Sequence, residues 1–128
     1  MPSTYEIDPA RQLATITSTG DVTGKDFIDA LLAVTADPAW QRDFDRLWNG
    51  KGIRTLDMTP DQFFRIIALE KDEATCARRT AIVVKTDEDL VAAKAHSVHM
   101  LRSYPTEIFL TVEEALAWLE KPTIQMEA

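Results

Sequence analysis

Two histidines and a single cysteine are the side chains of this 128-residue sequence that most readily bind a metal ion or attack a substrate. His96 and His99 lie three residues apart, so on a helix they share one face and could supply half of a metal site. No carboxylate or thiolate close to them in the sequence completes a ligand set. At about 100° per residue, both imidazoles also fall opposite the apolar positions of their segment. This pattern favours exposed surface histidines, and we predict no metal site.

Cys76 could act as a nucleophile if Arg78 and Arg79 approached its thiol and lowered the pKa of that group. A passive thiol ahead of a strand is the alternative that we favour. A single cysteine also rules out an internal disulfide, so the chain does not have the pattern of a disulfide-stabilised secreted scaffold. An enzyme with a dispersed site, built on Cys76 or on the histidine pair, stays as an alternative hypothesis.

Three further patterns match known sites only in part. Gly50-Lys51-Gly52 lacks the GxxxxGK[ST] spacing and the immediate helix of a phosphate loop, so we interpret it as a flexible connector. Asp87-Glu88-Asp89 could bind a cation, but acidic residues in the first turn of a helix already interact favourably with its dipole. Ser18, Ser97 and Ser103 lack the Gly-x-Ser-x-Gly setting of a hydrolase nucleophile. We therefore predict no catalytic residue and no cofactor.

The composition is that of an ordinary globular domain, with 45% hydrophobic and 27% charged residues. We expect one domain over residues 1–128, with an ordered core at about 4–120 and a frayed tail at 121–128. The net charge of −7 argues against nucleic acid and anionic membrane surfaces as partners. No apolar run approaches the ~18 residues of a membrane span, and the first residues do not form a signal peptide, so we expect a cytoplasmic protein.

Four threonines are each followed three residues later by Asp, Gln or Glu, just ahead of an apolar helical stretch. The pairs are Thr23/Asp26, Thr59/Gln62, Thr86/Asp89 and Thr111/Glu114. Each pair predicts a capping box, in which the two side chains satisfy free backbone N–H groups at the start of a helix. A strand-like segment precedes each pair, so the sequence predicts alternating strands and helices.

We expect strands at residues 5–8, 13–17, 43–49, 81–84 and 107–110, and helices at 23–36, 60–71, 87–102 and 112–119. A turn around Pro9 makes the first two strands an antiparallel hairpin. Residues 20–22 turn the chain into the first helix, and residues 50–56 form a mobile loop. The order ββαβαβαβα, with right-handed crossovers, predicts an α/β fold with a mixed, mostly parallel sheet.

The expected helix at 60–71 carries more apolar residues than one buried stripe needs. They are Phe63, Phe64, Ile66, Ile67 and Leu69. A helix that is apolar on nearly all sides either packs between layers or presents a surface to a partner. The preceding segment 49–59 leaves the carboxyl end of a strand and enters a helix, where ligands of open α/β sheets tend to bind. The residues predicted to contact a ligand or partner are Asn49, Asp57, Thr59, Phe63, Phe64 and Ile67.

Several segments occur in an order that is typical of one protein group. They are the N-terminal hairpin, Gly20-Asp-Val-Thr23, Leu47-Trp48-Asn49, Arg79-Thr-Ala-Ile-Val-Val84, Ile108-Phe109 and Glu113-Glu114-Ala115-Leu116-Ala117-Trp118-Leu119. Over residues 5–119 the chain resembles the SpoIIAA-like proteins of the STAS/SEC14-type group. The resemblance implies four turns of a βα superhelix with an N-terminal hairpin, and a non-enzymatic regulatory or small-ligand-binding role.

In the anti-sigma-factor antagonists, which share this fold, a serine or threonine at the start of the second helix is phosphorylated. The corresponding stretch here is Asp57-Met58-Thr59-Pro60, which lacks the Asp-Ser-Ser/Thr-Gly form, so a phospho-regulated switch at Thr59 is an alternative hypothesis. Our main prediction is a binding domain that engages a protein partner or a small apolar ligand through residues 60–71 and the preceding loop. A homodimer is one assembly that such a surface could form.

Overall fold

The computed structural model describes residues 3–72, 77–86 and 106–120. Along the chain its elements are β1 (Ser3–Asp8), β2 (Leu13–Thr23), α1 (Gly24–Ala36), β3 (Asp45–Asp57), α2 (Pro60–Lys71), β4 (Thr80–Val83), β5 (Thr106–Phe109) and α4 (Val112–Leu119). The predicted helix at 87–102 and the predicted tail at 121–128 lie outside the described residues.

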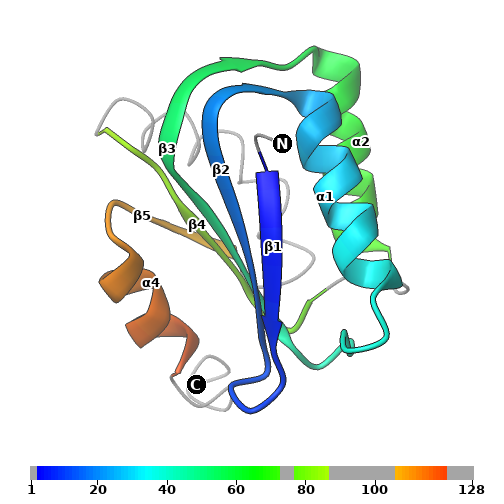
Figure 1. The fold of residues 1–128 in the computed structure, drawn as a ribbon, viewed down its shortest axis with the longest axis vertical. Helices are drawn as coiled ribbons and strands as arrows, with labels where there is room; N and C mark the ends of the chain where they lie inside the picture. The colour runs from blue at the N-terminus through cyan, green and yellow to red at the C-terminus, as the bar shows by residue number, and fades with distance from the viewer. Residues whose placement is uncertain (1–2, 73–76, 87–105, 121–128) are drawn as a thin grey trace.

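The five strands form one sheet in the order β1-β2-β3-β4-β5. β1 runs antiparallel to β2, and each of the other neighbouring pairs is parallel. Figure 1 shows α1 and α2 side by side against one face of the sheet and α4 against the other. The predicted hairpin and the mixed, mostly parallel sheet are therefore confirmed.

The helices begin at the predicted threonines because the caps satisfy backbone groups locally. Thr23 accepts from the Asp26 backbone N–H at 3.3 Å, and the Asp26 carboxylate accepts from the Thr23 backbone N–H at 2.8 Å. At the start of α2, the side chains of Thr59 and Gln62 likewise each accept a hydrogen bond from the backbone N–H of the other residue. At α4 the Thr111 hydroxyl accepts from the backbone N–H of Glu114 at 3.1 Å and donates to its carboxylate at 3.0 Å. The fourth predicted box includes Asp89, which lies outside the described residues.

The predicted mobile loop at 50–56 is wrong, and so is the predicted turn at 20–22. Both segments continue their strands and pair with each other in parallel, from Thr19 opposite Gly52 to Thr23 opposite Asp57. Two register irregularities bend the pair, and Gly20 takes a positive φ of 73° at one of them. At Gly52 the two strands approach each other closely, because an added Cβ would lie 2.7 Å from Cγ2 of Thr19.

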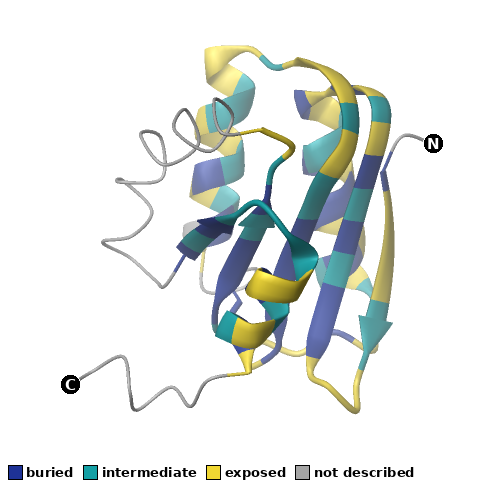
Figure 2. Cartoon of the chain, turned by 90° about the vertical axis from the view of Figure 1, so that its left-hand side faces the viewer, coloured by how far each residue is buried: buried dark blue, intermediate teal, exposed yellow. Residues whose placement is uncertain are grey.

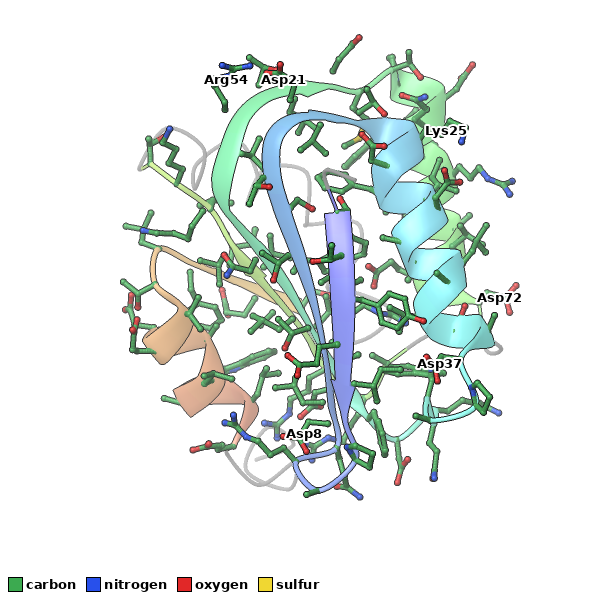
Figure 3. The ribbon with its side chains drawn as sticks, viewed as in Figure 1. Asp8, Asp21, Lys25, Asp37, Arg54 and Asp72 are labelled. Atoms are coloured by element: carbon green, nitrogen blue, oxygen red, sulfur yellow. The ribbon has the colours of Figure 1, made fainter. Side chains whose placement is uncertain are left out.

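We call residues 19–23 and 52–57 the β2–β3 arm. Figure 1 shows that the arm curves beyond the rest of the sheet and delivers the chain to the starts of α1 and α2. An exposed ion pair links its two strands. The Arg54 guanidinium donates to both carboxylate oxygens of Asp21, at 3.0 and 2.5 Å, and the Thr55 hydroxyl donates to the same carboxylate at 2.7 Å. Figure 3 shows Arg54 and Asp21 together at the bend.

Alternating side chains of the strands form a core on each face of the sheet. The face beneath α1 and α2 contains Ala14, Ile16, Ala30, Leu31, Val34, Trp40, Phe44, Trp48 and Ala77. The face beneath α4 contains Leu13, Leu47, Ala81, Val83, Ala115 and Leu119. Figure 2 shows this buried interior between the helix layers, with exposed residues on the outer faces of the helices. Within the described part of the chain, no helix is long and apolar enough to cross a membrane.

Candidate functional site

The apolar residues of α2 divide between the core and the surface. Ile67 is only 7% exposed and belongs to the interior, so it cannot contact a partner in this conformation. Phe64 is 63% exposed, whereas Phe63 is half-buried, and their ring centroids lie 6.0 Å apart. The apolar surface predicted for α2 therefore lies on the side of Phe64. Ile67 is also predicted to belong to that surface, but its burial argues against this.

Thr59 and Asp57 lie at the exposed junction between β3 and α2. The Thr59 hydroxyl accepts from the Gln62 backbone N–H at 3.1 Å, while the Gln62 side chain accepts from the Thr59 backbone N–H at 3.0 Å. Asp57 is the cross-strand neighbour of Thr23, the residue that caps α1. The N-termini of α1 and α2 therefore meet at the end of the arm, as Figure 1 shows.

A glycine allows these two helix starts to approach closely. An added Cβ at Gly24 would lie 2.5 Å from Oε1 and 2.8 Å from Cβ of Gln62. Gly24 is buried although it occupies the first position of α1. The contact places the first turn of α1 directly against the side chain that completes the α2 cap.

Asn49 does not end a strand, which corrects its predicted position at the end of the strand expected at 43–49. It lies inside β3, opposite Thr17 of β2 and Val83 of β4. Its side-chain oxygen accepts from the Lys51 backbone N–H at 3.2 Å. Asn49 and Asp57 are separated by a length of strand that could span up to about 26 Å. The structure therefore brings Asp57, Thr59 and the exposed side of α2 into one region, without Asn49.

A buried polar cluster beneath α2 was missed by the sequence analysis. The Glu70 carboxylate accepts from Arg46 Nη1 at 3.1 Å, from Trp48 Nε1 at 2.9 Å and from the Thr80 hydroxyl at 3.3 Å. The Arg46 and Glu70 side chains are 0% and 2% exposed, and the Arg46 guanidinium lies 5.0 Å from the centroid of the Trp40 ring. The cluster connects α2 to β3 and β4.

The buried cluster is suited to positioning α2 rather than to chemistry on a substrate. Its carboxylate already receives three hydrogen bonds from protein groups, and its side chains do not reach the surface. In the sequence, Arg46 and Glu70 look like ordinary surface residues, because charged residues are rarely buried. Only the tertiary structure indicates that they pair.

A cleft of about 230 Å³ lies at the opposite end of the molecule from the α1 and α2 starts. It is lined by Arg11, Leu13, Asp45, Arg78, Leu116, Leu119 and Glu120. Arg78 forms a two-pronged ion pair with Asp45, with distances of 2.9 and 2.8 Å, and this hydrogen bonding raises the pKa of Arg78 above its ordinary value. Arg11 donates to Glu120 at 3.4 Å across the mouth of the cleft.

The residues considered for an enzyme site, namely Cys76, His96 and His99, all lie outside the described residues. Within residues 3–72, 77–86 and 106–120, no three His, Cys, Asp or Glu side chains come together in a way that could hold a metal ion.

The similarity that we find between this chain and a known protein is one of structure. No family model matches the sequence, and no curated protein matches it either. The structure is similar to that of an uncharacterized protein of the DUF3478 family with a SpoIIAA-like fold, from Shewanella loihica PV-4. The two share 15% sequence identity with a TM-score of 0.61, and the similarity covers 91% of each chain. The predicted resemblance is thus confirmed at the level of the fold, which in this chain is SpoIIAA-like.

Proposed function

We propose that this chain is a non-enzymatic binding domain of the STAS/SEC14-like kind, which acts in regulation by recognising a protein partner through the exposed side of α2. The observation that carries the proposal is Phe64, a large aromatic side chain that is 63% exposed in the middle of a helix. Leu56, which is 49% exposed near the end of the arm, adds a second apolar residue on the preceding element. We call Leu56, Asp57, Thr59 and Phe64 the α2 surface.

The exposure of Phe64 favours a protein partner over a small apolar ligand. A small ligand binds where a concave site buries most of its surface, whereas Phe64 itself projects into solvent. An exposed aromatic ring beside polar groups is typical of a residue that fills a pocket on another protein. The polar residues Asp57 and Thr59 are exposed beside the ring's helix and would lie at the rim of such an interface. A second copy of the chain in the cytoplasm is one candidate for this partner.

A narrower alternative is regulation by phosphorylation of Thr59. Thr59 is an exposed residue at a helix N-terminus, where backbone N–H groups and the helix dipole favour a phosphate. The nearby carboxylates of Asp57 and Asp61 oppose the added negative charge. Incubation with a cognate kinase tests this alternative, because it requires modification of Thr59 itself; modification elsewhere, or none, counts against it.

Site-directed photo-crosslinking tests the main proposal. A photoreactive phenylalanine analogue at position 64 is compared with the same analogue at Leu32, an α1 residue that is 37% exposed. We expect a discrete adduct from position 64 and none from position 32, and its mass identifies the partner. With that partner purified, Phe64→Ser should weaken binding by at least about tenfold, and Leu32→Ser by less than about twofold.

Sedimentation of the intact chain separates the two kinds of protein partner. An adduct of doubled mass, together with a concentration-dependent dimer that Phe64→Ser abolishes, identifies a second copy of the chain. A different mass identifies another protein. A strictly monomeric chain that gives no adduct from position 64 beyond the level at position 32 would exclude the α2 surface as a binding site.

A further inference from the structure

The β2–β3 arm is a parallel pair of strands with no third strand beside it in the part of the chain that the structure describes. β1 pairs with β2 only as far as Ser18, and β4 pairs with β3 only as far as Asn49. Beyond these points β2 and β3 continue together to Thr23 and Asp57. Parallel sheets are usually buried, and a two-stranded sheet is marginally stable by itself. The arm is therefore an unusual element to leave without a neighbouring strand.

The free edge of β3 lies on the outer side of the bend. Figure 1 shows β2 on the inner side of the arm and β3 on the outer side. We call residues 51–57 the arm edge; all of them are exposed except Ile53, which is half-buried. An exposed edge is a template for pairing with a strand of another chain, and charged side chains on an edge normally discourage such pairing. Here the charges have both signs, so the partners that they exclude depend on the partner's own charges.

The charges of the arm balance. Two positive residues, Lys51 and Arg54, are matched by two negative ones, Asp21 and Asp57, whereas the whole chain carries a net charge of −7. Arg54 is already paired with Asp21 in its own chain. The Lys51 ammonium donates to the Leu110 carbonyl oxygen at 2.9 Å and has two further donors. Two copies of an acidic chain repel each other least where their surface is locally neutral, so the arm suits contact between copies.

The two apolar residues of the arm edge lie on one face. Ile53 is the cross-strand neighbour of Gly20, and Leu56 is that of Val22. Cross-strand neighbours project from the same face, as do alternate residues of β2, whose buried positions alternate as far as Val22. Residues three apart in a regular strand would face opposite sides. The extra residue Arg54, at the second register irregularity, brings Ile53 and the 49% exposed Leu56 to the same side.

From this arrangement we propose that the arm edge pairs antiparallel with the arm edge of a second copy of the chain, about a twofold axis between Arg54 and Thr55. Ile53 then lies opposite the partner's Leu56, on the same face. Gly52 lies opposite the partner's Asp57, and because Gly52 has no side chain, Lys51 beside it can reach that carboxylate. The twofold axis makes each of these contacts twice, and the two arms become one sheet with two strands from each copy.

The pairing is distinct from recognition through Phe64. It covers Leu56 and Asp57 of the α2 surface, but it is made by backbone hydrogen bonds along β3 and does not use α2. One strand pair is a small interface, so we expect a weak dimer whose population depends on the concentration of the chain.

Charge reversal in the intact chain tests the pairing by sedimentation equilibrium. Lys51→Asp places two carboxylates at each end of the paired edge, and Asp57→Lys places two ammonium groups there. Each variant alone should therefore dimerise at least about tenfold more weakly than wild type. An equimolar mixture of the two variants restores opposite charges at both ends and should form a heterodimer within about threefold of the wild-type affinity.

Lys25→Asp and Asp29→Lys are the matched controls, because they reverse the same charges at an exposed pair on α1. Each should change the dimer dissociation constant by less than about threefold, which separates a local effect from that of net charge. Phe64→Ser should leave this dimer intact. A dimer that Phe64→Ser abolishes and Lys51→Asp does not would belong to the α2 surface and overturn the arm pairing, whereas photo-crosslinking at position 64 tests the α2 surface separately.

Amide hydrogen exchange of the wild-type chain supplies a readout without mutation. Protection of residues 51–57 should rise with chain concentration along the same curve as the dimer seen by sedimentation, while that of α1 stays constant. The proposal is overturned if the chain is monomeric up to about 1 mM, if the protection of residues 51–57 does not change with concentration, or if the mixed variants do not associate. If a variant does not fold, the exchange measurement on wild type decides.

Discussion

Glu70 of α2 and Arg46 of β3 form an ion pair whose side chains are 2% and 0% exposed, with Nη1 and Oε2 3.1 Å apart. This pair lies in the layer between α2 and the sheet, where most contacts are apolar. Removing two charges from water is expensive, so the pair does not by itself imply high stability. Its geometry instead specifies how α2 sits on the sheet, and hence which side of α2 is exposed.

Breaking the Arg46–Glu70 pair should be strongly destabilising. Glu70→Gln removes the negative charge and leaves the buried guanidinium of Arg46 without that counter-charge, so we expect a loss of about 3–5 kcal/mol in the free energy of unfolding. Chemical denaturation measures it. The matched control is the double variant Arg46→Met with Glu70→Leu, which should recover much of the loss. A Glu70→Gln variant as stable as wild type would contradict the burial of the pair.

Substitution of Gly24 should separate the starts of α1 and α2. Gly→Ala within a helix is ordinarily stabilising by about 0.5–1 kcal/mol, but a methyl group here would lie 2.5 Å from the Gln62 side chain. We therefore expect Gly24→Ala to lower the free energy of unfolding by about 1–3 kcal/mol. Adding Gln62→Ala removes the contacts with Oε1 and Cδ and leaves the one with Cβ at 2.8 Å, so it should reverse part of the loss beyond additivity. Additive effects of the two changes would contradict this contact.

The α2 cap should depend on the hydroxyl of Thr59. Thr59→Ala leaves the Gln62 backbone N–H without its side-chain acceptor, so we expect a loss of about 1 kcal/mol in stability. Thr59→Ser keeps the acceptor and serves as the control, with little change expected. Thermal unfolding monitored by circular dichroism distinguishes them. Equal destabilisation by both variants would indicate that the methyl group of Thr59 matters more than its hydroxyl.

Truncation of two apolar residues of α2 should change the free energy of unfolding to very different extents. Ile67 is 7% exposed, so Ile67→Ala should lower the free energy of unfolding by about 2–5 kcal/mol through cavity formation. Phe64 is mostly in solvent, so Phe64→Ala should change stability by no more than about 0.5 kcal/mol. Denaturant titrations of the isolated chain compare them. A large loss for Phe64→Ala would mean that Phe64 stabilises the fold and is not available to a partner.

The Asp21–Arg54 pair on the arm should be visible in a pH titration. Hydrogen bonds from Arg54 and from Thr55 lower the pKa of Asp21 below 3.8, so its stabilising effect is present above the unfolded pKa and is lost as pH falls through the folded pKa. Arg54→Gln should raise the pKa of Asp21 toward 3.8 when the carboxyl carbon is followed by nuclear magnetic resonance.

Asp37 is the internal control for that titration. Hydrogen bonds from the Ala39 backbone N–H and from the Tyr5 hydroxyl lower its pKa, and neither involves Arg54. Arg54→Gln should therefore leave the pKa of Asp37 unchanged, whereas Tyr5→Phe should raise it. If Arg54→Gln left the pKa of Asp21 unchanged, the pair would not persist in solution.

The elements that could be predicted are those whose signals are local. Thr23, Thr59 and Thr111 each cap a helix within three residues of sequence, so their geometry does not depend on the rest of the fold. The hairpin at Pro9 and the apolar strand at β4 are local in the same sense. Strand ends were less predictable, because Gly50 and Gly52 are typical of loops but here lie in a strand held by pairing with β2.

The sequence by itself therefore determined the order of the strands and helices that the structure describes, the starts of those helices, and an apolar excess on α2. Tertiary structure decided which of those apolar residues is exposed: it buries Ile67 and exposes Phe64, and it separates Asn49 from Asp57. It also decided that Arg46, Glu70 and Arg79 are interior residues. The physical reason is that capping and turn formation involve neighbouring residues, whereas burial and ion pairing depend on groups that meet only after distant segments pack together.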